Sequence, residues 1–460
     1  LELRSENGKR LHYNSEFMEK NMQGERKTLT QLSVPICLET LFYMLSGMVD
    51  TLMLSSVSDQ AVGAVGTANT YIGVFIIMFG VISSGMVAVM SQNIGAGRPG
   101  IAYQARQLGL VFNALTGILM SVVLAVFSGG ILRAVSIAPA LFEPAETYLK
   151  IVGGASFLNA LIPIFSSYLR VFGYTKHSLI GTVVGNVINI ILNSVFLFVF
   201  NWGVMGVAAA TVFSKVVNLI IVAAMGAVLI KAKQSPERAQ PRKILAQIVK
   251  IGFPSAFETA LYNVAMTFIV CFMNHMDTDG MNVTARSYAM QIANFSYCVG
   301  AALAQANAIM TGWRIGAKKY EECDRGTRKA VIYGLVTATC FSVTFAITGR
   351  FIVHIFTNDI QMIELVVKLL VVDIFLEFGR VTNLVYGQAL KTSGDAIFPV
   401  IMGAIFMYLF AVGGTYFLGI HMGLLAVGAY IAMAGDECAR AVGMVLRWKS
   451  GKWKNKSLVE

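Results

Sequence analysis

The stretch Tyr71–Met90, YIGVFIIMFGVISSGMVAVM, contains no charged residue. As a helix that rises about 1.5 Å per residue, it spans about 30 Å, which is the thickness of the hydrocarbon core of a bilayer. Runs of the same kind recur, for example at Leu108–Phe127 and Ile401–Ile420. Of all residues, 56% are hydrophobic and 13% are charged, whereas soluble domains have about 25% charged residues. The pattern predicts an all-α polytopic membrane protein.

These apolar runs predict twelve transmembrane helices in two lobes of six, joined by a polar linker at the midpoint of the chain. The expected parts are a cytoplasmic N-terminal tail at 1–27, a first lobe at 28–230, a cytoplasmic linker at 231–244, a second lobe at 245–448 and a cytoplasmic C-terminal tail at 449–460. The fourth span is expected near residues 145–168.

The net charge of +11 follows the predicted topology and does not indicate a nucleic-acid surface. Lys and Arg gather in the loops on the side of both termini, whereas the loops on the other side hold Arg133 and Arg350. Cytoplasmic loops of membrane proteins carry such an excess. We therefore expect a multi-pass protein of the inner (plasma) membrane, with both termini cytoplasmic, lipid around it and no nucleic acid bound.

The two predicted lobes repeat one another. Similar short sequences recur in the same order and at a nearly constant offset along the chain. The matched pairs are Pro35–Thr40 with Pro254–Thr259, Ile94–Arg98 with Ile315–Lys319, Leu169, Arg170 and Gly173 with Leu390, Lys391 and Gly394, and Gly203 with Gly423. Six spans per repeat give both lobes the same orientation, related by a pseudo-two-fold axis. In transporters built this way, the substrate path lies between the repeats and one repeat rocks against the other.

An ionisable side chain inside a membrane is costly, so its presence indicates a function. Asp50 lies in the first span and has no cationic side chain within one helical turn along the sequence. The fifth span carries Asn186, Asn189 and Asn193 on one helical face. Carboxylate and amide oxygens suit Na⁺, and a desolvated carboxyl group can also carry a proton. A hydrogen bond between helices without a role in transport is the alternative.

Two repeat-equivalent glutamates lie one turn into the first span of each lobe. Glu258, with Tyr262 one turn further on, is expected to be functional. Glu39, its counterpart in the first lobe, is expected to complete polar contacts near the start of its helix.

The later spans of the second lobe carry further charges. Asp373, Glu377 and Arg380 share one face of the tenth span and form either an internal salt bridge or a site for a charged substrate. Arg286 lies in the eighth span. Asp436 lies in the twelfth span with Glu437 and Arg440, and these three either pair with the seventh or eighth span or form a packed ion network.

Methionine is frequent, with 23 residues, and its flexible side chain suits promiscuous binding surfaces. Met44, Met48, Met266 and Met290 are candidates for lining a substrate cavity. The sequence has no phosphate-binding G-x-x-x-x-G-K-[ST] loop, no cluster of metal ligands and no catalytic constellation. We therefore expect a transporter that needs a coupling ion and no other cofactor, and not an enzyme.

These motifs together resemble the MATE (multidrug and toxic compound extrusion) family over roughly residues 28–448. The resemblance rests on Pro35, Glu39 and Val49-Asp50-Thr51 in the first span, Gln92–Arg98 after the second, and Pro254 and Glu258 in the seventh. It implies two six-helix bundles in a V. It also implies export of organic, often cationic, drugs in exchange for inward H⁺ or Na⁺.

The resemblance also implies roles for particular residues. Asp50, Asn189, Asn193 and Thr211 match polar positions that form a cation site in the first lobe, and Na⁺ at Asp50 is one expectation. Some proton-coupled relatives have a carboxylate where Asn193 stands. The Na⁺-coupled branch has an aspartate where Arg380 stands, which favours a proton-coupled, DinF-like member.

Two other classes of protein fit the sequence less well. A flippase for a lipid-linked glycan, from the same superfamily, would need a strongly cationic cavity for pyrophosphate, and here the interior cations are few. A channel or receptor is disfavoured by the six-plus-six repeat and the sparse outer loops. We expect small-molecule drugs as substrates and a monomeric protein.

Overall fold

A computed structural model describes residues 27–134, 137–232, 235–276 and 280–459, and all regular structure in these residues is helical. The expected N-terminal tail lies outside the described residues, apart from its last residue. The first half contains α2 (Leu29–Ser55), α3 (Asp59–Gly95), α4 (Pro99–Val126), α5 (Ser128–Ala134), α6 (Pro139–Tyr148), η2 (Leu149–Gly153), α7 (Phe157–Val171), α8 (Thr175–Ser194), η3 (Val195–Val199) and α9 (Gly203–Leu229). The second half contains α10 (Pro241–Asn274), α11 (Met281–Gly316), α12 (Tyr320–His354), α13 (Ile360–Ser393), α14 (Ile397–Phe406), η5 (Met407–Val412), η6 (Thr415–His421), α15 (Leu425–Lys449) and η7 (Lys452–Lys456).

The helices confirm the twelve-span, two-bundle fold. Within the described ranges, eight helices are long and apolar enough to cross a membrane, and a bent pair of helices adds a ninth. Helices α11, α13 and α15, with 36, 34 and 25 residues, have the length to complete twelve. Charged residues such as Arg286 in α11, Asp373 in α13 and Asp436 in α15 lower the hydropathy of these three helices.

The fourth span, expected near 145–168, is formed by two helices with a break between them. Pro139–Gly153 and Phe157–Val171 are bent by 43° relative to each other. At the restart of the helix, the Phe157 backbone N–H donates a hydrogen bond of 2.9 Å to Ser121 Oγ of α4. A neighbouring helix therefore satisfies a backbone group that lipid could not satisfy.

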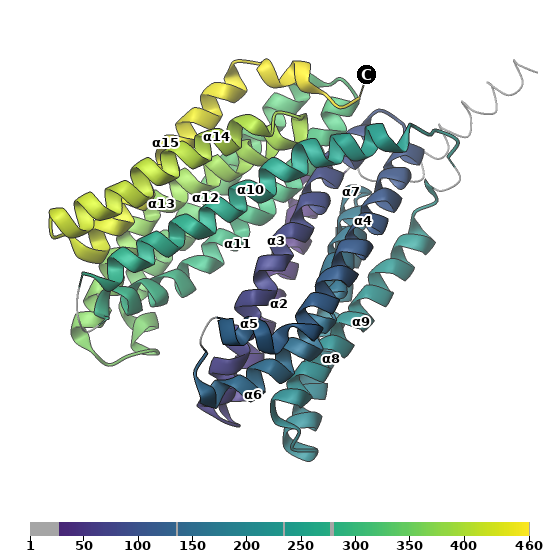
Figure 1. Ribbon diagram of the computed structural model, residues 1–460. Coiled ribbons are helices and arrows are strands. Elements are labelled where there is room, and N and C mark those ends of the chain that lie inside the picture. Colours follow the sequence, from purple (N-terminus) through teal and green to yellow (C-terminus); the bar gives the residue numbers. More distant parts are fainter. Residues whose placement is uncertain (1–26, 135–136, 233–234, 277–279, 460) are drawn as a thin grey trace, which may run out of the picture. The chain divides into compact units, whose positions relative to one another are not determined.

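The chain forms two compact units (Figure 1), one containing Leu38–Gly252 and the other Leu29–Cys37 together with Phe253–Glu460. Helices α2 and α10, the first of each half, change unit close to Pro35 and Pro254, respectively. A proline removes one helical hydrogen bond and loosens the helix locally. The sequence repeat thus extends to the place where the first helix of each half changes unit.

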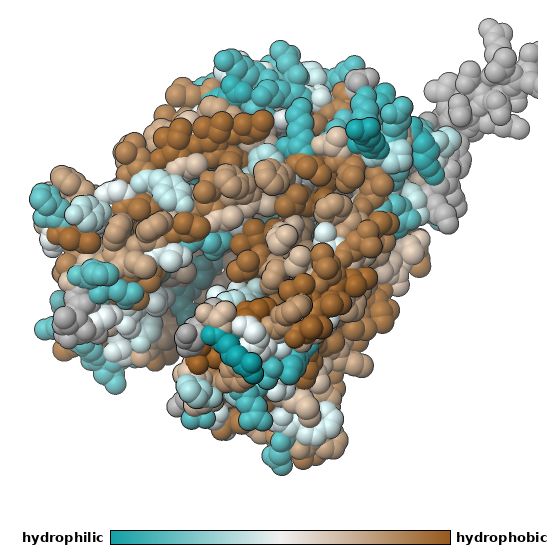
Figure 2. Space-filling view, viewed as in Figure 1, coloured by the Kyte–Doolittle hydropathy of each residue, from teal (hydrophilic) through white to brown (hydrophobic). Residues whose placement is uncertain are grey.

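Each unit has apolar side chains both in its core and on its outer face. Buried aliphatic residues such as Leu124 and Leu149 form the core of the first unit, and residues such as Ile269 and Leu369 that of the second. Yet Phe351 in α12 is 77% exposed. Figure 2 shows hydrophobic side chains over much of the visible surface of the long helices. Apolar exposure on this scale fits a surface solvated by lipid.

The segment after α15 packs against the second unit. Trp453 of η7 is 1% exposed. Gly394, which follows α13, has φ +100°, and a Cβ at this position would lie 2.1 Å from the Lys456 carbonyl oxygen. Glycine therefore permits both the left-handed backbone and the close approach of the C-terminal segment.

Candidate functional site

The predicted asparagine face of the fifth span lies against Asp50. Asn193 Nδ2 of α8 donates a hydrogen bond of 2.6 Å to Asp50 Oδ1 of α2 and lies 3.3 Å from Asn189 Oδ1, one turn earlier on its own helix. Asn186 of α8 does not reach Asp50 and instead donates a hydrogen bond of 2.8 Å to the Phe42 carbonyl oxygen of α2. Of the three asparagines on this face, Asn193 contacts the carboxylate and Asn189 contacts Asn193.

Two groups that the sequence did not connect with Asp50 lie within electrostatic reach of it. They are the Lys215 ammonium of α9 and the Tyr148 hydroxyl of α6. Thr211, one turn before Lys215, is buried beside Tyr148. The i, i+4 spacing of Thr211 and Lys215 was the signal that could have placed the lysine here. Asn193 Oδ1 is buried and has no hydrogen-bond partner among the described residues.

Glu39 forms a second polar cluster in the first unit. It accepts, at Oε1, from Arg170 Nη2 of α7 at 2.7 Å. Ser178 and Thr182 of α8 add hydroxyl donors at 3.0 and 3.4 Å. With three donors around one carboxylate oxygen, Glu39 joins three helices.

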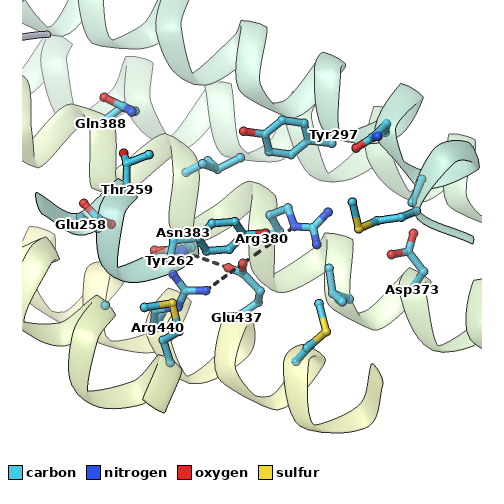
Figure 3. A pocket seen from close by; sticks show the side chains of 18 of the residues that line it. Glu258, Thr259, Tyr262, Tyr297, Asp373, Arg380, Asn383, Gln388, Glu437 and Arg440 are labelled. Atoms are coloured by element: carbon cyan, nitrogen blue, oxygen red, sulfur yellow. Dashed lines mark hydrogen bonds and ion pairs between the residues drawn. The ribbon is translucent and has the colours of Figure 1, made fainter. Parts of the chain in front are cut away.

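The second unit contains a cavity of about 400 Å³. Side chains of α10, α11, α13 and α15 line it, together with Gly403 of α14 and Met407 of η5. Tyr262, Tyr297 and Tyr430 give it aromatic walls, and Figure 3 shows Tyr262 and Tyr297 on either side of Arg380. This volume lies in the range of small-molecule sites, about 300–1,000 Å³.

A network of charges crosses the middle of the cavity (Figure 3). Arg380 of α13 pairs with Glu377 on its own helix and lies 3.8 Å from Glu437 of α15. Arg440 Nη2 lies 2.7 Å from Asp436 Oδ2 and 2.8 Å from Glu437 Oε1. Glu377 and Asp436 do not line the cavity but pair with the lining residues Arg380 and Arg440. The i, i+4 spacing puts Arg440 within reach of Asp436 on the same helix.

The two ends of the cavity carry carboxylates with different partners. Glu258 Oε2 lies 2.5 Å from Lys391 Nζ. Asp373 lines the other end and is 4% exposed, and it forms no ion pair or hydrogen bond within the described chain. Figure 3 shows Glu258 and Asp373 at opposite ends, with Arg380, Glu437 and Arg440 between them. Asp373 therefore presents a carboxyl group to the cavity that no described cation pairs with directly.

The four candidate methionines lie in different parts of the structure. Met290 lines the cavity, as do Met407 and Met433, which the sequence did not single out. Met266 packs against the core instead, and its sulfur lies 3.6 Å from Nη2 of the buried Arg286. Met44 and Met48 belong to α2 in the other unit, where Met48 is 43% exposed. Neither Met266 nor Arg286 lines the cavity.

Comparison with known proteins identifies a family model and relatives that match this chain. A family model described as MatE matches residues 35–195 and 254–417, two stretches that correspond to the two halves of the internal repeat. The chain is 32% identical to "Uncharacterized transporter YisQ" of Bacillus subtilis, over 94% of this chain and 96% of that protein. It is 26% identical to "Probable multidrug resistance protein NorM" of Thermotoga maritima, over 94% of each.

Solved structures share the fold. One is described as the "outward-facing conformation of a multidrug resistance MATE family transporter of the MOP superfamily"; it matches with a TM-score of 0.86 at 18% identity, covering 94% of this chain and 98% of that chain. Twelve membrane helices in two bundles, with carboxylates buried in both, define a membrane transporter. The chain belongs to the MATE family of multidrug efflux transporters, because the family model matches both halves and relatives match nearly its full length.

Proposed function

We propose that this protein is an antiporter that exports organic cations in exchange for an inward flow of H⁺ or Na⁺, by alternating access. We place it in the inner (plasma) membrane as a monomer, with both termini in the cytoplasm. The observation that carries the proposal is the excess of carboxyl groups at the cavity of the second unit. Five carboxyl groups line it or pair with its lining residues (Glu258, Asp373, Glu377, Asp436 and Glu437), against three cationic groups (Arg380, Lys391 and Arg440).

The chemistry of the cavity favours a bulky, apolar cation as substrate. Its tyrosines offer ring faces that attract a cation, an interaction worth about 0.5–2 kcal/mol. Its methionines adapt to different shapes. Asp373 supplies a negative charge with which no described cation forms an ion pair.

The polar cluster around Asp50 supports a role for this carboxyl group in coupling export to the inward flow of a cation. Its carboxylate and the unpartnered Asn193 Oδ1 are hard oxygen ligands of the kind that an alkali cation takes, and the carboxyl group can instead carry a proton. Either cation changes the charge of a half-buried group that contacts α8 and interacts with α9. Such a change in charge is a means of biasing one packing of the helices over another.

The flippase alternative is not favoured. A pyrophosphate-linked substrate requires an excess of cationic side chains, because each phosphate brings negative charge. Among the described residues that line this cavity, the three cations are matched by three carboxyl groups, and two further carboxyl groups, Glu377 and Asp436, pair with the lining arginines, so there is no cationic excess.

The test is ethidium efflux from proteoliposomes, with a Na⁺ gradient and a pH gradient imposed separately. We expect one inward gradient to accelerate efflux above that of protein-free liposomes, and that gradient identifies the coupling ion. If neither gradient accelerates the efflux of ethidium, the proposed function is wrong.

A further inference from the structure

The two halves contain the same ion pair. Glu39 pairs with Arg170 at 2.7 Å, and Glu258 pairs with Lys391 at 2.5 Å. The two glutamates are equivalent in the internal repeat, and so are the two cations. Each pair joins the first span of its half to the fourth, α2 to α7 and α10 to α13. The internal repeat thus includes a tertiary contact as well as short motifs.

The surroundings of the two glutamates differ. Ser178 and Thr182 donate hydroxyl groups to Glu39, and the offset that relates Arg170 to Lys391 relates these residues to Pro399 and Gly403. A Cβ at Gly403 would lie 3.4 Å from Glu258 Oε1, so this position faces Glu258 as Thr182 faces Glu39. Glu258 therefore lacks both hydroxyl donors, although the backbone around it is retained.

The pairs also differ in access. The Glu39 side chain is 8% exposed, whereas that of Glu258 is 23% exposed, and both Glu258 and Lys391 line the cavity. Arginine holds a carboxylate through a rigid planar fork, while lysine is a point charge on a flexible chain. The first pair is built as a fixed connection, and the second as one that can open.

We infer that Lys391 is a resident counter-ion of Glu258, which a cationic substrate displaces when it binds. The inference rests on the proposed function, because it requires that substrates are organic cations. Lys391 competes with the substrate for one carboxylate, so it determines how strongly a cation must bind to occupy the cavity. It also neutralises Glu258 when the cavity holds no substrate, which avoids an unpaired charge in the membrane.

The experiment measures binding to the full-length protein in nanodiscs, with protein-free nanodiscs as the background. Tetraphenylphosphonium and tetraphenylborate are probes matched in size and opposite in charge. We expect Lys391→Met to bind tetraphenylphosphonium about five- to tenfold more tightly, as about 1 kcal/mol of ion-pair competition implies, without a gain for tetraphenylborate. If Lys391 had only a structural role, the Lys391→Met substitution would not tighten cation binding.

Two further variants complete the test. Arg170→Met removes the equivalent cation of the first half and is expected to lower thermal stability without tightening tetraphenylphosphonium binding. Gly403→Ser returns a hydroxyl donor beside Glu258 and is expected to weaken cation binding relative to Gly403→Ala, even if Lys391→Met does not fold.

Unchanged or weaker tetraphenylphosphonium binding by Lys391→Met, or equal binding by Gly403→Ser and Gly403→Ala, overturns the role of Lys391. Export of organic cations by the wild-type protein would stand in that case. If the wild-type protein neither binds tetraphenylphosphonium nor exports ethidium, the proposed function fails and the inference fails with it.

Discussion

The two units share a scaffold and differ in where they hold charge. The first places its candidate coupling carboxylate, Asp50, on α2, a helix apolar enough to cross a membrane by composition alone. The second gathers charge on α13 and α15, which fall short of that criterion among the described helices and pair with each other around a cavity. A repeated fold therefore allows coupling and substrate binding to occupy different halves, because the backbone repeats without its side-chain chemistry.

Replacement of Asp50 by Asn is the strongest test of this division. We expect gradient-driven ethidium export to fall by about 5- to 150-fold, the usual size of a coupling between sites, because an amide cannot exchange H⁺ or balance Na⁺. Tetraphenylphosphonium binding in the second unit should persist. The matched control is Asn186→Ala, on the same face of α8 but bonded to the Phe42 carbonyl oxygen and not to Asp50, which should retain export. Full export by Asp50→Asn would remove Asp50 from the mechanism.

Replacement of Asp373 by Asn tests the second unit. We expect tetraphenylphosphonium affinity to fall about tenfold, or about 1.4 kcal/mol, because the carboxyl group faces the cavity and no described cation pairs with it. Equilibrium dialysis measures the effect. Glu364→Gln removes an exposed carboxylate from the same helix and controls for net charge. An equal loss in both variants would assign the effect to net charge and not to the cavity.

A smaller effect is expected at the C-terminal segment. Asp395, whose counterpart in the first half of the repeat is Tyr174, lies 2.7 Å from Arg447 and 2.9 Å from Lys456. Burial alone would raise the pKa of Asp395, but the hydrogen bonds from these two cations hold that pKa below its usual value. Its stabilising effect is therefore complete above the unfolded pKa of about 3.9 and is lost as the pH falls through the lower folded value.

At neutral pH we expect Asp395→Asn to lower the free energy of unfolding by about 1 kcal/mol. The thermal unfolding curves of the variant and the wild-type protein should converge below about pH 4. A difference that stays constant from neutral to acidic pH would show that the carboxyl charge does not hold the segment.

Much of the fold could be predicted from local patterns. The apolar runs located most spans, and three-residue and four-residue spacing placed Asn189 and Asn193 opposite Asp50. The break in the fourth span escaped prediction, because a hydropathy window averages over the short interruption between Gly153 and Phe157. The proximity of Lys215 to Asp50 depends on how α9 packs, and no periodicity in one helix contains that information.

The sequence by itself determined the membrane class, the twelve spans and the internal repeat, because a bilayer requires each span to be apolar over a fixed length. It also supplied Glu39, Glu258 and Asp373 as candidates. Only the tertiary structure decided that Glu39 has three donors, that Glu258 pairs with Lys391 and that Asp373 has no ion-pair partner within the described chain. The energy of a buried charge depends on groups that approach through space from other helices, and spacing along one helix fixes only the face from which that charge points.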